Sequence, residues 1–136
     1  LGGFLGDMGA YAPWIKEKTT IWKDSVLELA SAAKNYPQSA YAGYQRSLQQ
    51  EWQFFQRVQK DSGPDFVAVE EAISQEFLPS LFGDAYEDDD SDPRRLLASL
   101  PVKQAGLAMP DPTQSGKSKY EMSVLVCSHL LAALRG

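Results

Sequence analysis

The 136-residue sequence contains a single cysteine, Cys127, and a single histidine, His129. One cysteine excludes an internal disulfide framework, and the pair leaves too few ligands for a typical zinc site. No apolar run approaches the roughly 20 residues that a membrane-spanning helix needs. We therefore expect no metal, no cofactor and no membrane partner, and the single cysteine fits a reducing intracellular compartment.

We also expect no secretory signal in the first residues, because the apolar run 1–5 is too short and has no basic residues before it. The sequence begins with Leu1 rather than methionine, so we expect it to be a piece of a longer polypeptide. Its length and its apolar content of 43% suit one compact domain with a core of its own.

Positive charge is missing from the middle of the chain. Residues 61–92 contain eleven Asp or Glu and no Lys or Arg. Residues 1–60 contain seven Lys or Arg against five Asp or Glu, and residues 93–136 contain six against two. The net charge of −5 therefore does not exclude a nucleic-acid partner, because the acid is concentrated in one block.

Strand-like alternation is also missing, whereas apolar residues recur at helical spacing. We expect a first helix from Pro13, placed in its first turn, to residue 35, where the following Tyr36-Pro37 ends it. A second helix reaches residue 60, and a third runs over 65–78. Their predicted inward residues are Ile15, Thr19, Trp22, Val26, Leu29 and Ala33; Tyr41, Tyr44, Leu48, Trp52, Phe55 and Val58; and Phe66, Val69, Ile73 and Phe77.

The second half of the chain contains more loop. We expect an exposed acidic loop over 83–92, a helical turn over 94–100 and an irregular segment rich in proline and glycine up to residue 118. A last helix over 119–134 is predicted to point inward the residues Tyr120, Val124, Cys127, Leu131 and Leu134. The prediction is one all-α domain over 1–136: a lead-in strand or turn (1–12), three helices including an N-terminal αα-hairpin (13–82), loops (83–118) and a C-terminal helix (119–136).

Two short motifs imitate catalytic signatures. YEDD at residues 86–89 has the Y-x-D-D pattern of reverse transcriptases, but its acidic flanks cannot form the buried strands that two-metal chemistry requires. SGKS at 115–118 resembles the end of a phosphate-binding loop, yet position 111 is Asp where the pattern requires glycine. Cys127 and His129 are two apart on a helix and do not face each other. We predict no catalytic site in this chain.

Basic residues on the first two helices are the better candidates for function. Lys16, Lys23 and Lys34 share one helical face, and so do Arg46 and Arg57. Two such rows on neighbouring helices could follow a phosphate backbone. The alternative is an ordinary solvated face with acidic neighbours such as Asp24 and Glu28.

A family resemblance rests on four segments, in order along the chain. They are LGGFLG (1–6), YPQSAYAGYQRSLQQEWQF (36–54), EEA with FLPSLFG (70–72 and 77–83) and LPVKQAGLAMPDP (100–112). Together they resemble the region that follows the catalytic palm in reverse transcriptases of retroelements without long terminal repeats. In the last segment, Ala105 and Ala108 stand where that family often has glycine, and Gly106 alone is expected to supply the permissive turn geometry.

The resemblance implies a thumb-like region without a polymerase site of its own. Its partners would be the upstream palm and fingers of the same polypeptide and an RNA–DNA or DNA duplex, bound independently of sequence. The residues predicted to contact phosphate are Lys16, Lys23, Lys34, Arg46 and Arg57, followed by Arg94, Arg95 and Lys103. The alternative is a helical protein-interaction module that uses the acidic loop, or the off-stripe aromatic residues Trp14 and Phe54.

Overall fold

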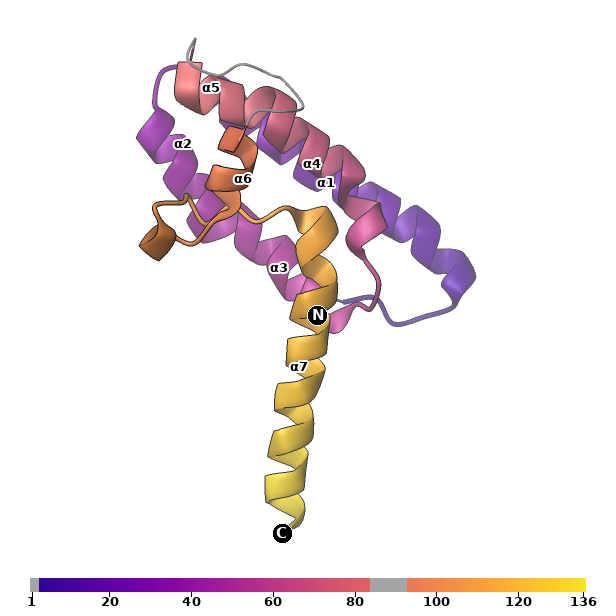
Figure 1. Ribbon diagram of the computed structural model, residues 1–136. Helices are drawn as coiled ribbons and strands as arrows, with labels where there is room; N and C mark the ends of the chain where they lie inside the picture. The colour runs from indigo at the N-terminus through magenta and orange to yellow at the C-terminus, as the bar shows by residue number, and fades with distance from the viewer. Residues whose placement is uncertain (1–2, 84–92) are drawn as a thin grey trace.

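The computed structural model describes residues 3–83 and 93–136, and this part of the chain is all-α, with no strand (Figure 1). The elements in order are α1 (Met8–Ala33), α2 (Pro37–Gly43), a π-helical segment (Tyr44–Leu48), α3 (Gln49–Val58), a 3-10 turn (Gly63–Phe66), α4 (Val67–Ala72), a second π-helical segment (Ile73–Phe77), α5 (Leu78–Phe82), α6 (Pro93–Ser99), a 3-10 turn (Val102–Gln104) and α7 (Pro112–Arg135). The predicted all-α class is confirmed.

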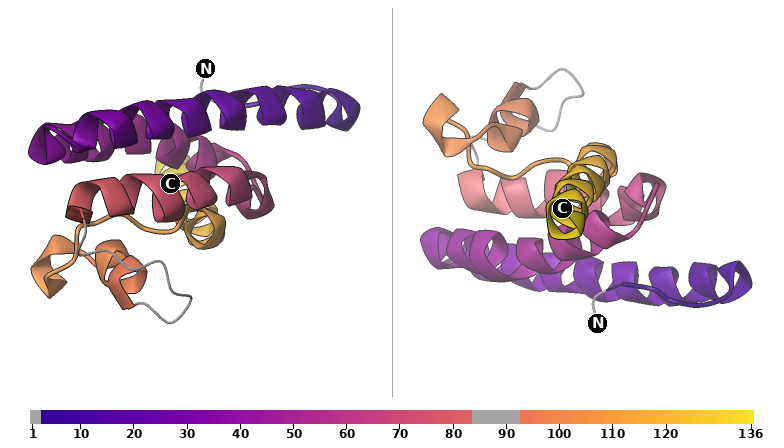
Figure 2. Two further views of the ribbon diagram at one scale, coloured as in Figure 1. Left: turned by 90° about the horizontal axis from the view of Figure 1, so that it is seen from above. Right: turned by 90° about the horizontal axis from the view of Figure 1, so that it is seen from below.

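The body is built from three long helical runs. The π segments join their neighbours without a break, so residues 37–58 form one run and residues 63–82 form another. With α1 they make a layered body, and the α1–α2 hairpin is confirmed (Figure 2). The two π segments meet in the core, where the Tyr44 and Phe77 rings stack with centroids 5.0 Å apart.

An aromatic cluster forms the centre of this body. Trp22 of α1 stacks on Phe66, with centroids 5.5 Å apart, and also contacts Trp52 and Phe55 of α3. Most of the predicted inward residues of the three runs are buried. Three differ: Leu29 and Tyr41 are only partly buried, and Val58, the last residue of α3, is exposed.

The predicted start of the first helix is wrong. α1 begins at Met8, and Pro13 lies inside it. A proline at this place removes only one early backbone hydrogen bond, to the carbonyl of Gly9, so the helix tolerates it close to its N-terminus. The predicted lead-in strand or turn over 1–12 is therefore helical from Met8 onward.

The segment before α7 is more regular than expected, because it contains a short helix and a 3-10 turn. The helical turn predicted over 94–100 is present as α6. The positive φ angles lie at Ala105 (63°) and Ala108 (52°), whereas Gly106 is not among the residues with positive φ, which corrects the expected role of that glycine. Gly106 is needed for another reason, because a side chain there would collide with the carbonyl of Leu100.

The last helix begins earlier than predicted and is not inward-facing. α7 starts at Pro112, where the Asp111 carboxylate accepts a hydrogen bond from the Thr113 N–H at 2.8 Å. Its first turns pack against α3 and the turn Gly63–Phe66, and the rest projects away from the body (Figures 1 and 2). Val124 (49% exposed), Leu131 (52%) and Leu134 (84%) lie on this projecting part. The prediction that its apolar stripe faces inward is wrong, because the described body ends before that stripe begins.

Candidate nucleic-acid interface

A groove runs along the junction of α3 and α7. Its first hollow is lined by Arg46 and four glutamines of the second helical run, by parts of the 99–110 loop and by Lys119 of α7. The adjoining hollow is lined by Arg57, by Lys119 and by further α7 residues. Lys119 therefore lies where the two hollows meet, between Arg46 and Arg57. We call this surface the α3–α7 groove.

Local sequence sets the shape of the groove. Gln45, Gln49 and Gln53 are four residues apart and so project from one side of the π segment and α3. Gln49 donates to the carbonyl of Ala108 at 3.0 Å, which fixes the loop as one wall. The groove passes a π-helical turn, an irregularity that is frequent at functional sites.

Buried polar contacts hold α7 against α3. The side-chain amide of Gln56 donates to the Pro112 carbonyl at 2.6 Å. Gly116 allows the close approach, because a Cβ there would already lie 3.3 Å from the Gln56 amide nitrogen and from the Ser62 hydroxyl. The position of Lys119 is therefore fixed by the packing of α7 rather than by a flexible loop.

Lys119 is the most perturbed cation of the groove. Burial, followed by the positive charge of Arg57, lowers its pKa to about 8. Its ammonium donates to the Ser115 hydroxyl at 3.2 Å and to the Gln56 amide oxygen at 3.4 Å, both neutral acceptors. Among the described residues that line the two hollows there is no Asp or Glu. An anion in the groove would thus supply the counter-charge that its lining lacks.

The structure separates the residues predicted to contact phosphate. Arg46 and Arg57 lie in the α3–α7 groove, whereas Lys16 and Lys23 on α1 and Lys34 just after it are exposed and line neither hollow. Lys103 is exposed on the 3-10 turn, and Arg94 is half-buried on α6. Lys119 is not among the predicted residues, because its proximity to Arg57 depends on how α7 crosses α3.

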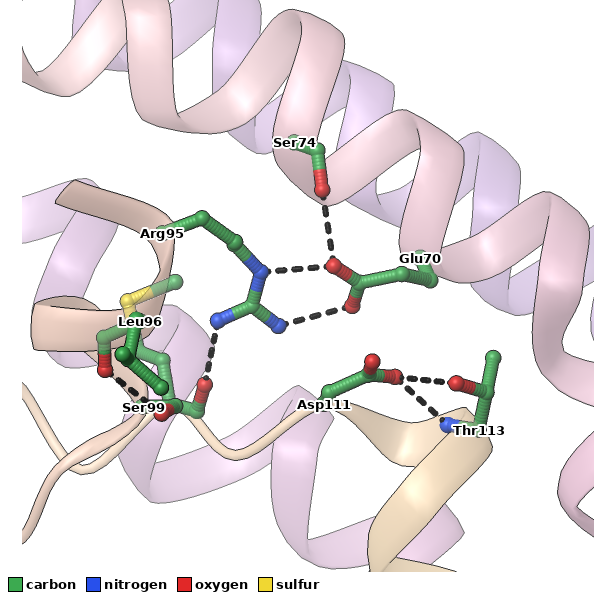
Figure 3. Close-up of polar contacts among 8 residues, drawn as sticks. Glu70, Ser74, Arg95, Leu96, Ser99, Asp111 and Thr113 are labelled. Carbon is green, nitrogen blue, oxygen red and sulfur yellow. Dashed lines mark hydrogen bonds and ion pairs between the residues drawn. The ribbon is translucent and has the colours of Figure 1, made fainter. Parts of the chain in front are cut away.

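Arg95 is bonded to other parts of the fold rather than directed to solvent (Figure 3). Its guanidinium forms a two-pronged ion pair with Glu70 of α4, at 2.6 Å and 2.7 Å, and donates to the Met109 carbonyl at 2.8 Å. Ser74 donates to the same carboxylate at 2.7 Å. These bonds fasten α6 and the loop before α7 to α4, and they turn the Arg95 donors inward. Arg95 therefore does not belong to the α3–α7 groove.

The catalytic-looking motifs do not form sites in the described part of the chain. Residues 115–118 lie within the α7 helix, so they form no phosphate-binding loop. Cys127 and His129 are exposed on α7. The YEDD motif, and nearly all of the predicted acidic loop, lies outside the described residues. Within 3–83 and 93–136, no group of three His, Cys, Asp or Glu side chains could hold a metal ion.

Comparisons with known proteins give no relative from which to transfer a function. No family model, no curated protein and no solved structure matches the chain. Among the described helices, none has the length and apolar character to cross a bilayer.

Proposed function

We propose that this chain is a thumb-like helical region that grips a nucleic-acid duplex by its phosphate backbone in the α3–α7 groove. The observation that carries the proposal is the row of cations Arg46, Lys119 and Arg57 along the groove. Among the described residues that line the groove, none is Asp or Glu. Phosphates attract such a row through charge alone, and each contact releases a counterion. Binding is therefore expected to depend strongly on salt.

The glutamines of the groove fit the same role. Amide side chains donate to phosphate and sugar oxygens, and these contacts orient a duplex without reading its bases. Gln45, Gln50 and Gln53 line the hollow beside Arg46. The proposed binding is accordingly independent of sequence, as expected of a region that follows a template–primer duplex.

The loop geometry supports the resemblance to reverse transcriptases on which the thumb-like role rests. Ala105 and Ala108 have positive φ angles, a conformation that glycine adopts most readily. These are the two positions at which the resembling loop often has glycine. In this proposal the chain has no polymerase site, and the palm and fingers belong to an upstream part of the polypeptide.

The test is a titration of the chain against a labelled RNA–DNA duplex by fluorescence anisotropy, at low and at moderate salt. We expect saturable binding that weakens steeply as salt rises and is the same for unrelated duplex sequences. Absence of binding even at low salt would overturn the proposal.

A helical protein-interaction module is the second candidate. It is favoured by a different observation, the exposed apolar surface on the projecting part of α7. Exposed apolar patches of this kind mark association surfaces. The acidic loop that could also serve such a module lies outside the described residues. Of the two off-stripe aromatic residues, Phe54 is 51% exposed, whereas Trp14 packs on Phe55 with ring centroids 5.8 Å apart.

A further inference from the structure

The projecting part of α7 has the sequence pattern of a coiled-coil strand. Its residues Tyr120, Val124, Cys127, Leu131 and Leu134 alternate at spacings of four and three, which is the a/d pattern of a heptad repeat. All but Tyr120, which is half-buried, are exposed. We call these five residues the α7 seam.

The polar residues of this segment form a second, narrow row beside the seam. Glu121, Ser128 and Arg135 are seven residues apart and so occupy the same heptad position, the e position. On the other edge of the seam lies Leu130, which is 60% exposed, in the g position. The seam thus has one polar edge, with a negative charge at one end and a positive charge at the other, and one uncharged edge formed by Ser123 and Leu130.

We propose that the α7 seam pairs with the seam of a second copy of this chain, in antiparallel orientation. When two such helices run in opposite directions, the e positions of one meet the e positions of the other along the same edge. With Val124 facing Leu134 of the second copy, and Cys127 facing its Leu131, Glu121 lies beside the second copy's Arg135. The two-fold symmetry repeats this ion pair at the other end of the overlap.

This register pairs four of the five seam residues, and Tyr120 lies beyond the overlap. On the edges, Ser128 lies beside Ser128 of the second copy at the centre of the polar edge, and Leu130 lies beside Leu130 of the second copy on the other edge. Glu121 is available for this pairing, because its contact with Lys117 is 4.0 Å long and its side chain is 62% exposed. Exposed pairs of that kind contribute little to stability.

A parallel pair does not achieve this match. In parallel coiled coils the e positions of one helix meet the g positions of the other. Arg135 would then lie beside Leu130, and Ser128 beside Ser123, so neither charge would find a partner. The antiparallel arrangement also places the two folded bodies at opposite ends of the helix pair, since each body packs only against the first turns of its own α7 (Figure 1).

Sedimentation equilibrium across micromolar concentrations tests the proposal. The chain is expected to form dimers, and Leu131→Glu is expected to weaken the dimer by at least about a hundredfold, because it places a charge in the seam. The matched control is Leu125→Glu. Leu125 is similarly exposed, 49% against 52% for Leu131, but lies off the seam. The control is expected to stay dimeric with an unchanged circular dichroism spectrum.

Charge reversal tests the register. Glu121→Arg alone should weaken the dimer, and adding Arg135→Glu should restore it, because the swapped charges match again. Crosslinking tests the orientation: with Cys127→Ala as background, which keeps the seam apolar, Ser128→Cys is expected to link two chains through a short bis-maleimide, and Ser118→Cys is not. A chain that stays monomeric, a dimer indifferent to Leu131→Glu, or a double swap without rescue would overturn the proposal and leave the seam to a partner of another kind, such as a different part of a longer polypeptide.

Discussion

The body (residues 8–82) and the projecting part of α7 show the same sequence periodicity with opposite outcomes. In the body, the apolar stripes of three helical runs close on one another around Trp22, Trp52 and Phe66. On α7, an equally regular stripe is exposed. Periodicity therefore identifies a helix and its apolar face, but not whether the partner of that face lies in the same chain. The body stabilises itself, whereas the α7 stripe is available for association.

The largest expected contrast comes from one substitution made in both regions. Leu78→Ala in the body should lower the free energy of unfolding by about 2–5 kcal/mol, because Leu78 is 0% exposed and its loss leaves a cavity. Leu131→Ala on α7 should change it by less than about 0.5 kcal/mol in the monomer. Urea denaturation at low protein concentration measures both. Equal losses would contradict the distinction between the two regions.

Ion pairs should show the same contrast with a somewhat smaller effect. Glu70→Gln leaves the largely buried Arg95 guanidinium without its counter-charge, and the expected loss of stability is about 3 kcal/mol. Glu121→Gln, which removes the exposed pair with Lys117, should cost less than about 0.5 kcal/mol. Both are read from urea denaturation of the monomer. A small effect at Glu70 would mean that the clamp does not hold α6 in place.

The loop between the regions should gain stability from glycine. Ala105→Gly relieves a residue with a φ of 63°, and we expect a gain of about 1 kcal/mol. Ala68→Gly, at an exposed position inside α4, should instead cost about 1 kcal/mol. Thermal unfolding distinguishes the two signs. A destabilising Ala105→Gly would argue against the left-handed backbone at this position.

A pH dependence is expected at the start of α7. The pKa of Lys119 is lowered from 10.5 to about 8, so above pH 8 the unfolded chain binds a proton that the folded chain does not. Lys119 should therefore contribute a rise in stability with pH between about 8 and 10.5, whereas Tyr11, Tyr41 and Tyr44, whose pKa values are raised by burial, contribute a fall once unfolded tyrosine ionises at about pH 10. Lys119→Met should remove this rise, whereas Lys117→Met, an exposed lysine on the same helix, should leave it unchanged. Urea denaturation at several pH values provides the measurement.

Much of the fold could be predicted because it depends on local sequence patterns, namely the spacing of apolar residues and the positions of proline. Ile73 and Phe77 follow the helical period, and Tyr36-Pro37 marks a helix boundary by its own stereochemistry. The start of α7 was missed although its signals are local: Asp111 is an N-cap and Pro112 an N1 proline, but they lie in a segment that proline and glycine made look irregular.

The candidate site was harder to predict than the fold. Arg46 and Arg57 could be placed on one face from their spacing, but the relation between Arg57 and Lys119 depends on a tertiary crossing of helices. The same is true of Arg95. Its residue type suits a phosphate contact, but in the fold its guanidinium is paired with the Glu70 carboxylate. Sequence spacing reports which residues share an element, whereas the site depends on which elements meet.

The central claim, that the α3–α7 groove binds a duplex, is tested most directly by one comparison of affinities. The Arg57→Gln/Lys119→Gln variant and a Lys16→Gln/Lys23→Gln variant each remove two positive charges, the first from the groove and the second from the exposed face of α1. Fluorescence anisotropy with an RNA–DNA duplex should show that the groove variant binds weakly and that its salt slope falls by about two, while the α1 variant loses much less. Equal losses in the two variants would contradict a site in the groove and indicate binding by diffuse charge.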